Sequence, residues 1–387
     1  MERFALSRMK EWKENENRKP LIIRGARQVG KTWIMKTFGQ QYFEKTAYVN
    51  FDNNARMKQV FEGDLDIERL VLSISAETGV SIEAENTLII FDEVQEVPKA
   101  LTSLKYFYEN APQYAIVAAG SLLGVALHQG TSFPVGKVDF LDLYPLNFRE
   151  FLCAMGEKQF VSMLDSCDTQ MVTVFKTKYI ERLREYYFVG GMPEVVKDFS
   201  EKKDYNRVRA IQKNLINYYQ QDFSKHAEIK LVPRLNLVWN SIPMQLAKEN
   251  KKYIYGQVRE GSRAKDFELA IQWLLDCGLI HKVQRIQKPD LPLKAYIDFD
   301  AFKLFLVDIG LLIAMTDLDA KVIIEGNKIF TEFKGALTEQ YILQQLISDV
   351  GVIPYYYSTQ NSKGEIDFLY FSYLISASND LVQKAIG

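Results

Sequence analysis

Two hydrophobic patterns alternate from the polar stretch ENENRKP to about residue 152. The short apolar runs LIIR, AYVNF, LIIF, YAIVAA and VDFLDL are typical of strands. Between them, KTWIMKTFG, ERLVLSISAETG and KALTSLKYFYEN have the spacing of amphipathic helices. Strands that alternate with helices predict a parallel sheet covered on both faces. Residues 2–13 predict one further helix ahead of this sheet.

The rest of the chain shows other patterns. Residues 155–225 are mostly helical and are interrupted at Gly190 and Gly191, before Pro193. Residues 230–285 predict helix, turn, helix and strand, which is the order of a winged helix-turn-helix, and the segment QRIQKPDLPLKAYID would be its wing. From residue 303 come the run KLFLVDIGLLIAM, the helix KIFTEFKGALTEQYILQQLI and the strands VIPYYYS and EIDFLYF.

Composition adds few constraints. The 387 residues are 47% apolar and 25% charged, as in ordinary globular proteins. Lys and Arg number 48 against 49 Asp and Glu, so contact with nucleic acid or an acidic membrane would need a local patch. The three cysteines are scattered, and the N-terminus lacks an apolar signal segment. The longest apolar runs are shorter than the roughly 20 residues that span a bilayer, and we expect a cytoplasmic protein without a membrane segment.

The segment GARQVGKT matches the phosphate-loop pattern GxxxxGK[ST] in full. A predicted strand leads into it and a predicted helix leads out, as this loop requires. Gly25 and Gly30 let the backbone curl so that successive amides converge on phosphate groups. Lys31 brings a positive charge to the outer phosphates, and Thr32 offers a hydroxyl to Mg²⁺. The residues expected to bind nucleotide are Gly25, Ala26, Arg27, Gln28, Val29, Gly30, Lys31 and Thr32.

A second motif lies where the apolar run TLIIF ends in Asp92 and Glu93. Such a run is typical of a central strand buried on both faces. At its carboxyl end, Asp92 is expected to hold the Mg²⁺ shell through water, and Glu93 to orient and polarise an attacking water. Ser121, at the end of YAIVAAGS, is a candidate to hold this water near the γ-phosphate.

Phosphoryl transfer also requires a cation that meets the charge of the transition state. The sequence offers Arg27 in the loop, Lys137 in PVGKVDF and Arg149 in PLNFREF. Alternatively, a neighbouring subunit supplies one of these cations to the site. A homo-oligomer is therefore a candidate assembly.

The motifs GARQVGKT, FDEVQ, AAGS and LYPLNFREF resemble bacterial and archaeal AAA-type ATPases that carry a second, poorly characterised domain. YFVGGMPEVV, LLDCGLI, LFLVDIGLL, GALTEQYI and GEIDFLYF follow in that family's order, so the resemblance covers residues 2–370. It implies the roles above for the loop, Asp92 and Glu93, with Ser121 as the sensor. Where the family often has Gly-Arg, this chain has Gly136 and Lys137, and Lys lacks the planar fork of Arg.

The resemblance implies an α/β fold with a P-loop AAA-type parallel sheet, then a helical and winged-helix region, then a small α+β tail similar to restriction-type nucleases. The expected domains are an ATP-binding domain at 1–155, a helical lid or linker at 156–225, a winged helix-turn-helix at 226–302 and a nuclease-like tail at 303–387. The tail is expected to be truncated, because the family's tail is longer.

The nuclease core implied by the resemblance needs a Glu from a helix, an Asp from a strand and Glu-x-Lys from the next strand. Glu339 and Asp367 are the matching metal-ligand candidates. Glu365 and Asp367 alternate along their strand and should share one face. No Glu-x-Lys follows in FSYLISASNDLVQKAIG, so we expect a nuclease-like fold with incomplete chemistry.

Three functions stay open at this point. The first is an Mg²⁺-dependent ATPase whose nucleotide state drives or gates the winged-helix and tail domains, with DNA as a candidate partner of the basic winged-helix region. The second is a slowly hydrolysing, nucleotide-gated protein-interaction module, which the Lys137 substitution favours. The third is an ATP-coupled nuclease, which the missing Glu-x-Lys disfavours.

Overall fold

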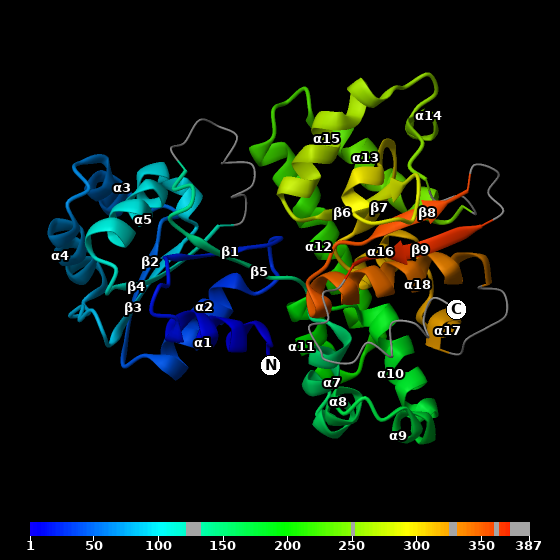
Figure 1. Cartoon of the computed structure of the whole chain (residues 1–387), viewed down its shortest axis with the longest axis horizontal. Helices are drawn as coiled ribbons and strands as arrows, with labels where there is room; N and C mark the ends of the chain where they lie inside the picture. The colour runs from blue at the N-terminus through cyan, green and yellow to red at the C-terminus, as the bar shows by residue number, and fades with distance from the viewer. Residues whose placement is uncertain (121–132, 249–251, 325–330, 360–363, 372–387) are drawn as a thin grey trace.

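The computed structural model shows an N-terminal region beside a larger C-terminal region, coloured blue to cyan and green to red in Figure 1. The structure describes residues 1–120, 133–248, 252–324, 331–359 and 364–371. Ser121, the candidate sensor, lies outside these residues. None of the described helices combines the length and apolar character needed to cross a bilayer.

The first sheet has five parallel strands in the order β2-β3-β4-β1-β5. The centre of β1 pairs with strands on both sides, since Ile22 is in register with Ala118 and with Phe140. The predicted parallel sheet and its strands are thus confirmed. The strands are β1 (Leu21–Arg24), β2 (Lys45–Asn50), β3 (Thr87–Asp92), β4 (Ala115–Ala119) and β5 (Asp139–Asp142).

Both faces of this sheet are covered, which explains why its central strands β1, β3 and β4 are largely apolar rather than alternating. Leu21 and Ile23 join one hydrophobic cluster with α1 and α2, whereas Ile22 joins a second cluster with α3, α4 and α5. Figure 1 shows these two helical layers on opposite faces. Their bounds are α1 (Ala5–Glu14), α2 (Lys31–Tyr42), α3 (Ala55–Glu62), α4 (Ile67–Thr78) and α5 (Pro98–Asn110), with a short 3₁₀ turn η1 (Val94–Glu96) before α5.

The chain then enters a helical region that begins with α7, after the last strand of the first sheet. Its helices pack on one another and on the C-terminal sheet (Figure 1). They are α7 (Phe148–Ala154), α8 (Lys158–Asp165), α9 (Thr169–Val174), α10 (Lys176–Val189), α11 (Pro193–Lys202), α12 (Tyr205–His226), α13 (Val232–Leu246), α14 (Tyr255–Val258) and α15 (Ala264–Asp276).

The second sheet joins strands that are distant in the sequence, in the order β7-β6-β8-β9. β6 is antiparallel to β7 and parallel to β8, so residues 226–302 and residues 303–387 contribute to one sheet, and β7 crosses the expected boundary between them. The remaining elements are β6 (Ile280–Ile286), η2 (Leu293–Tyr296), β7 (Ile297–Leu306), α16 (Ile309–Met315), α17 (Ala320–Ile324), α18 (Thr331–Gln345), the π-helical turn η4 (Leu346–Val350), β8 (Tyr355–Ser358) and β9 (Glu365–Leu369).

Asp308 is a buried carboxylate that ties three helical segments together. Its carboxylate accepts hydrogen bonds from the Gly191 amide at 2.6 Å, the Leu311 amide at 3.1 Å and the Gln344 side chain at 3.2 Å. Burial raises the pKa of Asp308 from its ordinary 3.8 to about 6, although these hydrogen bonds pull it down. The folded protein therefore holds a proton on Asp308 at pH values where the unfolded chain has lost it.

This shift predicts a pH dependence of stability. Between about pH 4 and pH 6 the folded state binds more protons at Asp308 than the unfolded state does, so this residue's contribution to the unfolding free energy falls as pH rises. An amide at this position cannot titrate, and the stability of the wild type relative to Asp308→Asn should fall by up to about 3 kcal/mol over this range. Urea unfolding of both proteins from pH 4.5 to 7.5 measures this, and a difference that stays constant with pH contradicts it.

Candidate functional site

The loop between β1 and α2 has a conformation that depends on its two glycines. Gly25 has φ of 145°, and a Cβ atom there would lie 2.1 Å from the Leu143 carbonyl oxygen. Gly30 has φ of 96° and is the N-cap residue of α2. Because Gly30 has no side chain that could cap α2, the first-turn amides stay accessible to an anion.

Two motifs that are distant in the sequence meet beside this loop. The Thr32 hydroxyl donates to Asp92 Oδ2 at 2.7 Å, and the Tyr48 hydroxyl donates to the same oxygen at 2.9 Å. Burial, together with Asp92, raises the pKa of Tyr48, so its hydroxyl stays a donor. Tyr48 was missed from the sequence, although its place on β2, in register with Ile90 of β3, put it next to the acidic strand end.

Lys31 is buried at the start of α2. Its ammonium donates to the carbonyl oxygens of Gly25 at 2.8 Å and Ala26 at 2.7 Å. Burial lowers the pKa of Lys31 to about 8, against the opposing effect of Glu93 and Asp92. A negatively charged ligand at the loop would favour the charged form further.

Glu93 follows Asp92 with a left-handed backbone, at φ of 52°. A non-glycine residue in this region is uncommon and costs free energy, and such residues cluster at functional sites. The Gln95 side chain donates to Glu93 Oε2 at 2.7 Å and orients the carboxylate. The two acids that the sequence predicted at the strand end therefore differ in conformation, with Asp92 in the strand and Glu93 in the turn after it.

The other side of the loop is held by residues that the sequence did not indicate. The Arg3 guanidinium donates to the Val29 carbonyl at 2.9 Å, and the Tyr219 hydroxyl donates to the Arg27 carbonyl at 2.9 Å. The Arg27 side chain turns to α12, where it forms an ion pair with Asp222 and donates to His226 Nε2 at 3.2 Å. No local pattern links residues so far apart, so only the fold reveals these contacts.

The three candidate cations lie in different places. Arg27 is engaged with α12, as described. Lys137 forms an ion pair with Glu109 at 3.0 Å and precedes β5, at the edge of the sheet where β1 begins. The loop follows the end of β1, so within one chain Lys137 is at the opposite edge from it.

Arg149 lies on α7 and contacts the C-terminal region. It forms ion pairs with Asp165 and, at 3.0 Å, with Asp349. Its guanidinium also lies 5.0 Å from the centre of the Phe4 ring. The structure thus brings Lys31, Thr32, Asp92 and Glu93 together, and it places Lys137 and Arg149 apart from them.

A second cluster of charged side chains gathers in the C-terminal sheet. Lys303 of β7 lies 3.2 Å from Glu339 Oε2, 2.7 Å from Glu365 Oε1 and 3.6 Å from Asp367 Oδ1. Burial lowers the pKa of Lys303, but Glu339 and Glu365 more than offset this, so the pKa lies above its usual value. The structure brings both predicted acids of the tail together, around a lysine that the sequence did not indicate.

The two clusters differ in their fit to a metal ion. Thr32 and Asp92 offer hard oxygen donors 2.7 Å apart beside a phosphate loop, which suits Mg²⁺ shared with a nucleotide. In the tail, the centre of the acids is occupied by the Lys303 ammonium. Over the described part of the chain, no group of three or more His, Cys, Asp or Glu side chains has the arrangement of a metal site.

Known families match two parts of the chain. Residues 17–152 match the AAA domain family, and residues 180–322 match a domain of unknown function (DUF8612). No curated protein sequence matches the chain.

Among solved structures, the Walker-type ATPase PABY2304 of Pyrococcus abyssi is similar, with a TM-score of 0.50 and 15% identity over 81% of this chain and 95% of that one. The Aeropyrum pernix Orc1 protein in complex with DNA gives a TM-score of 0.28 at 13% identity, over 81% and 91% of the two chains. RuvB of Thermotoga maritima gives 0.31 at 10% identity, over 72% and 87%. Scores as low as the last two carry no weight.

The strand order, the loop geometry and the match over residues 17–152 identify this part of the chain as an AAA-type P-loop domain. They support nucleotide binding and ATP hydrolysis as its activity.

Proposed function

We propose that the chain binds ATP with Mg²⁺, hydrolyses it, and uses the nucleotide state to gate its C-terminal region. The observation that carries this proposal is the hydrogen bond of 2.7 Å between Thr32 and Asp92, which unites the phosphate loop with the acidic strand end. Mg²⁺ bound there would neutralise phosphate charge as it develops.

Each residue of the site has a role in this proposal. The amides of residues 25–32 and the Lys31 ammonium bind the phosphates. Thr32 and Asp92 would hold Mg²⁺, Asp92 through water. The Glu93 carboxylate, fixed by Gln95, orients the attacking water. Ser121 remains the proposed sensor of the γ-phosphate.

The transition-state cation is proposed to come from a neighbouring copy of the chain. Lys137 and Arg149 both lie away from the loop of their own chain, and Arg27 is engaged with Asp222. An assembly that places Lys137 or Arg149 against the next copy's loop would complete the site. Lys137 supplies a point charge without a planar fork, which is consistent with slow hydrolysis.

Gating is supported by contacts between the loop and the C-terminal region. Tyr219, Asp222 and His226 of α12 all bind Arg27. We propose an AAA domain at 1–155, a helical lid at 156–225, a winged helix at 226–302 and a nuclease-like tail at 303–387, with α12 joining the loop to the latter two.

We propose that Lys303, and not a metal ion, neutralises Glu339 and Asp367 in the tail.

DNA is the candidate partner of the winged-helix region. The exposed residues Arg259, Arg263 and Lys265 surround the start of α15. Two other basic side chains there are paired with acids, Arg285 with Asp298 and Lys288 with Asp290. These pairs reduce the local positive charge, and binding through it should weaken steeply with salt.

The proposal is tested by ATP hydrolysis with the purified full chain. Turnover should require Mg²⁺ and stop on addition of EDTA. Stimulation by duplex DNA at low salt would assign DNA as the partner, whereas equal turnover with and without DNA would favour a protein partner. Absence of ATP binding in the presence of Mg²⁺ would contradict the proposal.

A further inference from the structure

The phosphate loop is held from outside at two of its peptide groups. In a trans peptide, the carbonyl and the following N–H point in opposite directions. The Val29 carbonyl is turned toward Arg3, so the Gly30 N–H points away from Arg3. The Arg27 carbonyl is turned toward Tyr219, so the Gln28 N–H points away from α12. Two amides of the loop therefore owe their direction to side chains outside it.

We propose that Arg3 and Tyr219 are positioning residues that turn the amides of Gly30 and Gln28 toward the phosphates of the nucleotide. This inference rests on the proposed ATP binding. Both side chains act through the loop backbone and touch its outer side. Both also lie outside the matched AAA segment 17–152, Arg3 before it and Tyr219 within the segment 180–322.

Arg3 is held rigidly enough for this role. Its Nε donates to Glu150 Oε1 at 3.1 Å, and its Nη2 donates to the Tyr144 carbonyl at 2.6 Å. The side chains of Arg3 and Glu150 are only 4% and 6% exposed. The guanidinium thus spans three acceptors at once, with Val29 as the third, which only the planar fork of an arginine allows.

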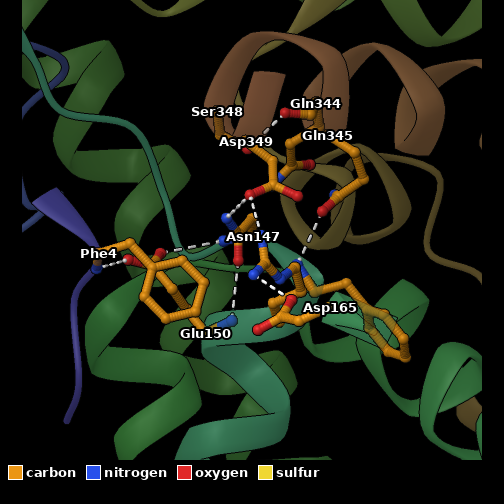
Figure 2. A network of polar contacts seen from close by, with 10 residues as sticks. Phe4, Asn147, Glu150, Asp165, Gln344, Gln345, Ser348 and Asp349 are labelled. Atoms are coloured by element: carbon orange, nitrogen blue, oxygen red, sulfur yellow. Dashed lines mark hydrogen bonds and ion pairs between the residues drawn. The ribbon is translucent and has the colours of Figure 1, made fainter. Parts of the chain in front are cut away.

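The partner of Arg3 is itself part of a polar network that reaches the C-terminal region (Figure 2). Glu150 accepts from the Phe4 amide at 2.7 Å and forms a capping box with Asn147 at the start of α7. Asn147 donates to Asp349 of η4 at 3.3 Å. The position of η4 is therefore connected, through α7 and Arg3, to the direction of the Gly30 amide.

Tyr219 is held equally well from the other side. It is buried on α12, with its ring 6.1 Å from that of Trp239 on α13. Burial, with Asp308 and Asp222 nearby, raises the pKa of Tyr219, so the hydroxyl remains a hydrogen-bond donor. Asp222 and His226 of the same helix bind the Arg27 side chain. A shift of α12 would therefore turn the Arg27–Gln28 peptide, which gives the C-terminal region a route to the nucleotide.

Tyr219→Phe is the sharpest test, because it removes one hydroxyl and keeps the buried ring. We expect the Kd of Mg·ATP, measured by titration calorimetry on the full chain, to rise about fivefold. Arg3→Lys keeps the charge beside Glu150 but cannot span three acceptors, and it should raise the Kd about tenfold. In both variants KM should rise with the Kd, while kcat at saturating ATP stays near the wild-type value.

Tyr179→Phe is the matched control. The Tyr179 hydroxyl on α10 also donates to a carbonyl, that of Phe160 on α8 at 2.8 Å, which is outside the loop and outside the network around Glu150. This variant should lower Tm and leave the Kd unchanged, because a purely structural loss reduces the folded fraction and not the affinity.

The outcomes separate cleanly. Wild-type affinity in both Tyr219→Phe and Arg3→Lys overturns the inference, as does an equal loss of affinity in Tyr179→Phe. Failure of the wild type itself to bind ATP overturns the proposed function, and the inference with it. Raised Kd values in the two loop-facing variants alone support the inference.

Discussion

Lys31→Ala is expected to lower the affinity for Mg·ATP by about 100-fold and to reduce turnover below detection. The ammonium is buried and lies against the loop, so no other described side chain can replace its charge at the outer phosphates. Calorimetric titration with Mg·ATP measures the affinity, and phosphate release measures the turnover.

Lys58→Ala serves as the matched control, because Lys58 lies exposed on α3. It should bind and hydrolyse ATP as the wild type does. A melting temperature for Lys31→Ala close to that of the wild type would show that the loss arises at the site. If Lys31→Ala binds ATP as tightly as Lys58→Ala, the loop is not the nucleotide site.

Lys303→Met is expected to lower the unfolding free energy by about 3–5 kcal/mol. The Lys303 side chain is 1% exposed and that of Glu339 is 7% exposed, so the substitution leaves a buried carboxylate without its cation. Removing one partner of a buried ion pair costs far more than the pair itself contributes, because the remaining charge stays desolvated. Urea denaturation of the full chain measures the loss.

Two variants give this prediction its controls. Lys303→Met combined with Glu339→Leu removes both buried charges and should recover most of the lost stability. Asp367→Asn removes a carboxylate that is 54% exposed and 3.6 Å from the ammonium, and it should cost less than about 1 kcal/mol. Unchanged stability in Lys303→Met would contradict this account, and plasmid cleavage with Mg²⁺ that Asp367→Ala abolishes would restore the nuclease hypothesis.

The parts of the fold that could be predicted depend on local patterns. The central strands of the first sheet, β1, β3 and β4, are largely apolar because both of their faces are buried, and Leu21 to Ile23 show this directly. The phosphate loop could be predicted because its chemistry requires a contiguous segment between a strand and a helix. Glu365 and Asp367 were expected on one face of a strand, and both reach Lys303.

The parts that could not be predicted depend on contacts between distant residues. Arg3 lies just before α1 and Tyr219 lies on α12, yet both bind the loop. Lys303 is the first residue of the apolar run KLFLVDIG. A single lysine at the start of such a run usually extends its ammonium group into solvent. Its partners are visible only in the fold, where α18 brings Glu339 and β9 brings Glu365 to it.

Local patterns also missed helix α3. Only Met57 and Phe61 of α3 are buried, which is a single apolar pair four residues apart and too little to mark a helix in the sequence. The helix forms because Phe61 packs on Phe51 and on Phe91 of β3, and because the Asn54 side chain caps it by accepting from the Met57 amide at 3.0 Å. Its stability is therefore a tertiary property.

Phosphate release from ATP by the wild type and by Glu93→Gln, with ATP binding measured on the same samples, tests the central claim most directly. The wild type should release phosphate only with Mg²⁺. Glu93→Gln should bind ATP as the wild type does and turn over about 100-fold more slowly, since the amide cannot act as the base that orients and activates water. Equal turnover in the two proteins would contradict the assignment of this site.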